Sequence, residues 1–262
     1  MKIVHLIDIP WWSGLSFYAY ECVLAHRASG HEVIAAVEDN SLFQEKVRLS
    51  GIETVTLAGR KFWQSPINLY RIAEIVARHK PDCIVAHTGS THWIAVVCGL
   101  AGGIPVIRTR CRSSATASTF HGSWIYRQTR CTVSASRGLN REILDRLPHS
   151  MKRRAVTLYP PLEMPENSAP SENSPRISRR IGVLARLDPV KGLENFLSAA
   201  KTVQQEVPDA EFAIAGAEEN LKWSDLSALA ADLGLKNVVY HGFIRPAQVP
   251  EFVQNCGIGV IS

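Results

Sequence analysis

The sequence lacks the spacings that mark a cysteine-based or membrane-spanning protein. Its six cysteines form no C-x-x-C pair, and four of them sit inside apolar runs. This pattern favours free, buried thiols in a reducing compartment over a disulfide framework. The N-terminal MKIVHLID is too short for a signal peptide, and no stretch reaches ~18 uninterrupted apolar residues. We therefore expect a cytoplasmic chain that does not span a membrane.

A Gly-rich dinucleotide fingerprint is also missing. Neither half of the chain has G-x-G-x-x-G after its first strand, although Glu38 or Asp39 lies at a plausible place for a ribose contact. This absence disfavours a nicotinamide-dependent dehydrogenase. No RNA-binding or zinc signature is present either, so we expect no nucleic acid partner and no metal.

The positive charge is concentrated in one segment. The net charge is +5, but residues 104–154 hold eleven Lys or Arg against only Glu142 and Asp145, so this segment carries +9 and the rest of the chain −4. Such asymmetry favours an anionic partner, such as a phosphorylated ligand or an anionic membrane surface. A solvated basic face without a partner is the alternative.

Strand-like and helix-like segments alternate along the chain. The apolar runs KIVHLID (2–8), HEVIAAV (31–37) and CIVAHT (83–88) are each followed by a helix-like stretch. Continuously apolar strands are typical of a parallel sheet with helices on both faces. One helix is expected to begin with Ser65 as N-cap and Pro66 at its first position. The pattern predicts an α/β fold with a doubly wound, Rossmann-like sheet.

Residues 160–179 interrupt this alternation. The stretch has five prolines, several serines and no apolar periodicity, which is typical of a linker. Beyond it the alternation restarts with RIGVLA, AEFAIAG, NVVYHGF and GIGVIS. We predict a Rossmann-like domain over 1–159, a Pro/Ser-rich linker over 160–179 and an incomplete second Rossmann-like domain over 180–262.

The stretch VLARLDPVKGLENF (183–196) combines cations with a helix start. A strand ends near Ala185, Arg186 follows, and Lys191 and Gly192 open an amphipathic helix. The backbone N–H groups of that helix start, with Arg186 and Lys191, would make a compact site for a diphosphate. A surface Arg and Lys that flank a turn without a ligand are the alternative.

This stretch resembles a motif of a known enzyme family. ARLDPVKG is similar to the G-R-L-x-x-x-K-G element of the retaining glycosyltransferases of GT-B fold in glycosyltransferase family four, with Ala185 in place of the glycine. SGLSFYAYECVLAHRASGHEV resembles the opening loop and first helix of that family, and PDCIVAHTG, LYPPLE and NVVYHGFIRPAQVPEF resemble later parts. IPVIRTR is similar to the lipopolysaccharide branch of the family.

The resemblance implies a function and a set of site residues. The enzyme would move a sugar from a nucleotide-diphosphate sugar to a glycan or lipid-linked acceptor, with retention and without a cofactor, in cell-surface polysaccharide assembly. The first domain would serve the acceptor and the second the nucleotide sugar. The implied catalytic residues are Arg186 and Lys191, which would also bind the donor together with Ser13, Gly14, Gly216 and Glu218; the acceptor-side residues would be His87, Arg108 and Arg110.

Two pairs of interpretations stay open. Trp11 and Trp12 could offer a stacking surface for a sugar or a grip on lipid, or pack in the core beneath the loop. His87 could contact the acceptor or be a satisfied histidine at a strand end. The basic segment 104–154 predicts peripheral attachment to the inner membrane face.

The sequence departs from the family pattern at three places. Cys111 stands where relatives often have a histidine near the donor, and Ala217 stands where a second glycine is usual. The sequence ends at Ser262, before the Glu-x7-Glu element of the family, so we expect a truncated chain with weakened donor binding. The alternatives are a non-catalytic binding module that keeps only the diphosphate site, and a sugar-nucleotide epimerase of the same fold.

Overall fold

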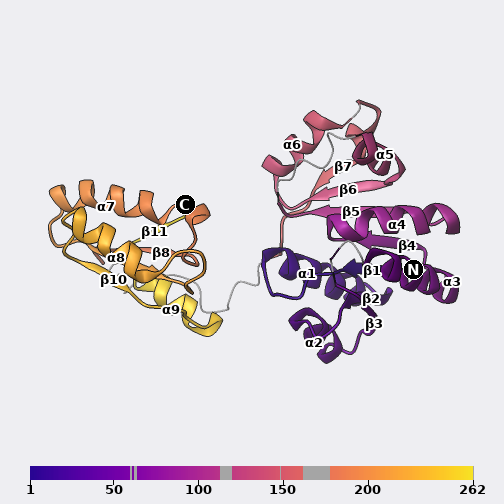
Figure 1. The fold of residues 1–262 in the computed structure, drawn as a ribbon, viewed down its shortest axis with the longest axis horizontal. Coiled ribbons are helices and arrows are strands. Elements are labelled where there is room, and N and C mark those ends of the chain that lie inside the picture. Colours follow the sequence, from indigo (N-terminus) through magenta and orange to yellow (C-terminus); the bar gives the residue numbers. More distant parts are fainter. Residues whose placement is uncertain (60, 62–63, 113–119, 148, 162–177, 262) are drawn as a thin grey trace. The chain divides into compact units, whose positions relative to one another are not determined.

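The chain forms two compact units, residues Met1–Met164 and Pro165–Ser262. The computed structural model describes residues 1–59, 61, 64–112, 120–147, 149–161 and 178–261 (Figure 1). Most of the predicted linker, 160–179, lies outside these described residues. Each unit is an α/β structure built on its own parallel sheet.

The first unit is built on a parallel sheet in the order β3-β2-β1-β4-β5-β6-β7. Its strands are β1 (Lys2–Ile7), β2 (Glu32–Glu38), β3 (Glu53–Leu57), β4 (Cys83–Ala86), β5 (Val106–Arg110), β6 (Cys131–Ser134) and β7 (Ala155–Thr157). The helices between them are α1 (Gly14–Ala28), α2 (Leu42–Leu49), α3 (Ser65–His79), α4 (Gly89–Gly102), α5 (Phe120–Gln128) and α6 (Arg137–Arg146), with a short 3-10 turn at His149–Arg154. The strand order reverses between β1 and β4, as in the predicted doubly wound fold.

Both faces of this sheet are covered, which explains the continuously apolar strands. Ile34 and Ala36 of β2 join a core cluster with α3 and α4, whereas Val33 and Ala35 of the same strand join another cluster with α1 and α2. Successive side chains of a strand point to opposite faces, so a strand buried on both sides carries no polar alternation.

Side-chain caps start several of these helices. Ser13, Ser41, Thr88 and Ser136 each accept a hydrogen bond from the backbone N–H three residues ahead. Such caps satisfy one of the N–H groups that a helix start leaves without a partner. The predicted cap at Ser65 is wrong by one position, because Gln64 is the N-cap of α3 and Ser65 is already helical.

The second unit has a four-stranded parallel sheet in the order β10-β9-β8-β11. Its strands are β8 (Arg180–Leu184), β9 (Glu211–Ala215), β10 (Val238–Tyr240) and β11 (Ile258–Val260), and its helices are α7 (Leu193–Glu206), α8 (Trp223–Asp232) and α9 (Val249–Gln254). Short 3-10 turns precede α7 and α9 at Pro189–Lys191 and Pro246–Gln248. Here the order reverses between β8 and β11. In the described part of the chain, no helix has both the length and the apolar character needed to cross a membrane.

Candidate active site

The predicted diphosphate loop follows β8, at the point where the strand order of the second sheet reverses. Ligands of open α/β sheets bind at such points, beyond the carboxyl ends of the strands. Leu187 anchors the loop: it is fully buried, its N–H donates to Ala217 O (2.8 Å), and its carbonyl accepts from the N–H groups of Glu219 and Leu221. The loop that carries Arg186 and Lys191 is therefore fixed to the loop after β9.

Asp188 braces the centre of the diphosphate loop. Its Oδ1 accepts from Val190 N–H (3.0 Å) and its Oδ2 accepts from Asn220 Nδ2 (2.7 Å). The Val190 N–H and the Asn220 amide lower the pKa of this carboxyl, and the charges of Arg186 and Lys191 lower it further. Asp188 is thus an ionised brace between the two cations. An aspartate before Pro189 is a common helix-start signal, so the sequence alone could have identified it.

Arg186 has a carboxylate partner that the sequence analysis missed. Its Nη1 lies 2.9 Å from Oε1 and 2.7 Å from Oε2 of Glu219, and both side chains are about half exposed. No spacing rule predicts this pair, because Glu219 belongs to the loop after the next strand. Glu219 orients the guanidinium, and it competes with any anion for the same donor.

Lys191 ends a 3-10 turn, and Gly192 then opens α7. Gly192 adopts the left-handed conformation (φ 60°), and none of the described side chains caps the helix that it starts. The first backbone N–H groups of α7 can therefore donate hydrogen bonds to an anionic ligand bound at this loop. Glu194 in the first turn of α7 reduces the positive potential there.

Gly216, predicted to contact the donor, has a structural reason for its identity. A Cβ at this position would lie 1.9 Å from Ala185 O, and its φ of +152° is rarely adopted by other residues. Its carbonyl also accepts from Tyr240 Oη (2.8 Å). Gly216 lets the loop after β9 pack directly on the backbone that leads to Arg186.

Glu218, also predicted to contact the donor, is engaged within its own unit. Its Oε1 accepts from Trp223 N–H (2.8 Å) at the start of α8, and its Oε2 lies 3.4 Å from Lys222 Nζ. The Trp223 N–H lowers the pKa of this carboxyl. In this structure Glu218 therefore holds the start of α8.

In the first unit, Ser13 and Gly14 form the start of α1 after β1. Ser13 is the N-cap, and a Cβ added to Gly14 would meet no atom within 4 Å. The space at Gly14 is therefore open to a ligand.

The two tryptophans before Ser13 differ. Trp12 packs on Tyr20 and Phe43, and Lys46 Nζ lies 4.8 Å from its ring centroid. These contacts agree with the interpretation that Trp12 packs in the core. Trp11 is 55% exposed. Only Trp11 keeps the surface that stacking on a sugar or lipid would need.

His87 is a buried histidine at the end of β4 rather than an exposed contact. It is 1% exposed, its Nε2 lies 2.9 Å from His5 Nδ1, and its Nδ1 lies 2.8 Å from Thr109 Oγ1. Burial and the charge of Arg108 lower its pKa to about 3. His5 in turn lies 2.9 Å from His26 Nδ1, so the three rings form a hydrogen-bonded chain that the sequence analysis did not anticipate.

Arg108 and Arg110 come together on the other face of β5. Arg110 donates to Tyr126 Oη of α5 (2.7 Å), and Arg108 donates to Ala86 O (3.0 Å). Thr109 lies between them in the sequence and bonds His87, so the arginines and His87 use opposite faces of the sheet. The three predicted acceptor-side residues therefore divide into a pair and a separate histidine.

The cations of the basic segment 104–154 fall into a buried group and an exposed group. Arg108 and Arg110 are buried, whereas most of its remaining cations are exposed. The exposed cations are Arg112, Arg127, Arg130, Arg137, Arg141, Lys152, Arg153 and Arg154. Cys111, at the position of the family histidine, is half-buried, and burial raises its pKa to about 11, so it is a neutral thiol.

Buried polar atoms without a hydrogen bond gather at the carboxyl ends of the strands of the first sheet. Within the described residues they include Asp8 Oδ1 just after β1, Arg108 Nε near the end of β5, and Ser134 Oγ at the end of β6. Such atoms are uncommon in native structures, and each calls for a partner. Asp8 is 1% exposed and was missed, because a polar residue after an apolar strand is common to many loops.

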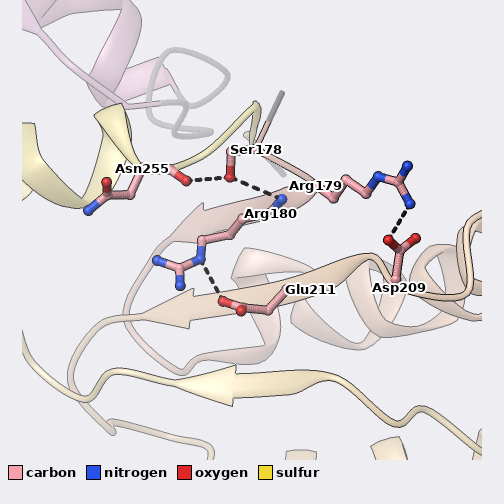
Figure 2. A pocket seen from close by; sticks show the side chains of 6 residues that line it. All are labelled: Ser178, Arg179, Arg180, Asp209, Glu211 and Asn255. Carbon is pink, nitrogen blue, oxygen red and sulfur yellow. Dashed lines mark hydrogen bonds and ion pairs between the residues drawn. The ribbon is translucent and has the colours of Figure 1, made fainter. Parts of the chain in front are cut away.

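A separate hollow of about 400 Å³ lies at the amino ends of β8 and β9. Figure 2 shows that its charged side chains face one another: Arg179 pairs with Asp209, and Arg180 pairs with Glu211. Ser178 Oγ donates to Asn255 O (2.7 Å) on the same rim. The charges are mutually neutralised at the opposite edge from Arg186, so this hollow is not a second anion site.

The two parallel sheets define an α/β protein with two Rossmann-like units. Residues 12–162 match the family model described as Glycosyltransferase Family 4, and residues 166–262 match glycosyl transferases group 1. Because the first match covers more than half of the sequence, the chain belongs to Glycosyltransferase Family 4 and is a glycosyltransferase. The predicted family and enzyme class are therefore confirmed. No curated protein sequence matches the chain.

Solved structures share its fold at low identity. HepE from Anabaena in complex with UDP and glucose has a TM-score of 0.73 and 15% identity, over 100% of this chain and 74% of HepE. The apo form of the lipopolysaccharide outer core galactosyltransferase WaaB has a TM-score of 0.74 and 13% identity, over 100% of this chain and 74% of WaaB. A UDP-GlcNAc 2-epimerase from Neisseria meningitidis bound to UDP-GlcNAc has a TM-score of 0.63 and 12% identity, over 99% of this chain and 76% of the epimerase. These likenesses confirm the predicted α/β, Rossmann-like GT-B architecture.

Proposed function

We propose that the enzyme transfers a sugar from a nucleotide-diphosphate sugar to a glycan or lipid-linked acceptor, with retention. The observation that carries this proposal is the loop after β8, which presents Arg186 and Lys191 on either side of the Asp188 brace and ends at the uncapped start of α7. Two cations and free helix N–H groups suit two linked phosphates. HepE, which shares this fold, was solved with UDP-glucose, and this supports a nucleotide sugar as donor.

In the proposed reaction Arg186 and Lys191 act on the leaving group. Negative charge grows on the diphosphate as the glycosidic bond breaks, and fixed positive groups stabilise that charge in the transition state. Leu187 and Gly216 hold the loop before the donor arrives, so little reorganisation accompanies binding. We propose Ser13 and Gly14 as further donor contacts, because the start of α1 is open.

We propose cell-surface polysaccharide assembly as the setting, with attachment to the inner face of the membrane. The exposed cations of 104–154 support this, because each Lys or Arg near an anionic leaflet contributes about 1 kcal/mol to binding. Flotation with anionic liposomes at low and high salt tests it. Salt-sensitive binding is expected, and no binding at low salt would overturn the membrane proposal alone.

A binding and turnover screen tests the central proposal. A panel of nucleoside diphosphates and their sugars is scored by thermal shift, and the positive donors are then assayed for transfer. We expect Arg186→Ala and Lys191→Ala to abolish the thermal shift, whereas Lys201→Ala on the exposed face of α7 keeps it. Donor binding unaffected by both loop substitutions would overturn the proposal.

The same assay separates the two other functions that the fold permits. Release of an epimerised nucleotide sugar without transfer would identify an epimerase, a reaction carried out by the structural neighbour from Neisseria meningitidis. Donor binding with neither product would identify a non-catalytic binding module. Either result contradicts glycosyl transfer while leaving the diphosphate loop in place.

A further inference from the structure

Two arginines are buried side by side on β5. Arg108 is 8% exposed and Arg110 is 4% exposed, and both project toward the face covered by α4 and α5. The charge of Arg110 lowers the pKa of Arg108, after the larger effect of burial. Two like charges held together away from water are costly unless an anion lies nearby.

Arg108 has too few acceptors for its guanidinium. Within the described residues, its Nη1 donates to Ala86 O and its buried Nε has no hydrogen bond. The Tyr126 side chain also makes a hydrogen bond with this guanidinium. A guanidinium offers five N–H donors, and a carbonyl and a phenol hydroxyl, both neutral, do not balance its full charge. The side chain is therefore held in place with donor capacity left over.

Among the described residues, no carboxylate acts on the Arg108 guanidinium. Residues 83–141, from β4 to the beginning of α6, contain neither Asp nor Glu. The groups that act on the pKa of Arg108 are Tyr126, Arg110 and Cys111, none of which is a carboxylate. The nearby His87 and His92 cannot supply a counter-charge, because an imidazole is either neutral or cationic. Burial and the arginines lower the pKa of both rings, which favours their neutral form.

A second orphaned donor lies on the neighbouring strand. Ser134 stands opposite Arg110 in the β5–β6 register, is fully buried, and its Oγ has no hydrogen bond among the described residues. Registered residues of adjacent parallel strands point to the same face. An oxyanion placed here would accept from the guanidinium and from the hydroxyl.

We propose that Arg108 and Arg110, with Ser134, form a binding site for an oxyanion, a phosphate or a carboxylate, carried by the acceptor. The link to the acceptor rests on the proposed function, whereas the anion site itself does not. The site lies in the first unit, and the diphosphate loop lies in the second. An acidic acceptor, such as a phosphorylated or uronic acid-bearing glycan, fits this chemistry, and a neutral glycan does not.

The test measures the NMR signal of the Arg108 guanidinium while anions are added. The Nε–H resonance of Arg108 is assigned in the full-length ¹⁵N-labelled chain by its disappearance in Arg108→Lys. The chain is then titrated with inorganic phosphate, acetate and chloride at matched ionic strength. We expect a saturable shift of this resonance with phosphate or acetate but not with chloride. A response to phosphate alone indicates a phosphorylated acceptor, and a response to acetate indicates a carboxylate.

Variants separate this site from the donor site. The shift is expected to persist in the Arg186→Ala/Lys191→Ala double variant and in Arg127→Gln, which removes an exposed charge from α5. Ser134→Ala is expected to weaken phosphate binding severalfold. An Arg108 resonance that does not move with either oxyanion overturns the inference, even if donor binding is normal. Loss of donor binding with an intact Arg108 response would instead contradict only the proposed function.

Discussion

Arg186 and Glu219 form an ion pair across two loops of the second unit, with Nη1 of the arginine within 2.9 Å of both carboxylate oxygens. The pair keeps the guanidinium oriented in the loop proposed to bind the diphosphate. It also puts a negative charge where an anionic ligand should bind. The same contact therefore both orients Arg186 and opposes ligand binding.

Removing that carboxylate should tighten anion binding. Exposed ion pairs contribute about 0.2–1 kcal/mol, so we expect Glu219→Gln to bind inorganic diphosphate up to about fivefold more tightly. Isothermal titration of the full chain measures the change. Glu206→Gln, at the exposed far end of α7, is the matched control and should leave affinity unchanged. Weaker binding by Glu219→Gln would show that orienting Arg186 outweighs the repulsion.

Gly216 gives a second prediction, on stability. A Cβ at Gly216 would overlap Ala185 O, and its φ is unfavourable for alanine, so Gly216→Ala should lower the free energy of unfolding of the second unit by roughly 2 kcal/mol or more. Gly14→Ala is the control, because its Cβ would enter open space. Urea denaturation, monitored by hydrogen exchange of the β8 and β9 amides, measures the free energy of unfolding of the second unit. Equal stability of the two variants would contradict the packing argument.

The contrast between these residues shows what the sequence could and could not reveal. The strands, their parallel order and the cationic loop were predictable, because continuous apolar runs and the ARLDPVKG spacing are local signals. Glu219 and Asp8 were not, since their importance depends on contacts between loops far apart in the sequence. His87 was recognised as a strand-end residue, but its burial follows from His5 and Thr109, which no spacing rule connects to it.

Trp11 and Trp12 should behave differently on substitution. Trp12 packs on Tyr20 and Phe43, so Trp12→Ala should lower the free energy of unfolding by about 2–4 kcal/mol. Trp11 is 55% exposed, and Trp11→Ala should leave stability within about 0.5 kcal/mol. Chemical denaturation measures both. A Trp11→Ala variant as unstable as Trp12→Ala would show that both rings belong to the core.

The chain of His26, His5 and His87 predicts loss of stability in acid. Burial lowers the pKa of all three rings, that of His87 to about 3, whereas an unfolded histidine titrates near 6.5. Below that value the unfolded chain binds protons that the folded unit does not. The stabilisation is therefore complete above about pH 6.5 and falls as the pH drops toward the folded-state values, by up to about 1.4 kcal/mol per pH unit for each of the fully buried rings His5 and His87. The half-buried His26 contributes less, because solvent screens its charge.

The contribution of a single ring to this pH dependence can be measured by substitution. Urea denaturation between neutral and mildly acidic pH, followed by hydrogen exchange of the β1 and β4 amides, should show the first unit losing stability as the pH falls. His87→Gln removes one of the protons taken up on unfolding, so its stability should depend less steeply on pH, although its stability at neutral pH is also lower because Thr109 and His5 lose a partner. His241→Gln, at an exposed position of the second unit, should keep the full dependence. An unchanged slope in His87→Gln would mean that this ring is already protonated in the folded state, and that the buried chain contains a charge.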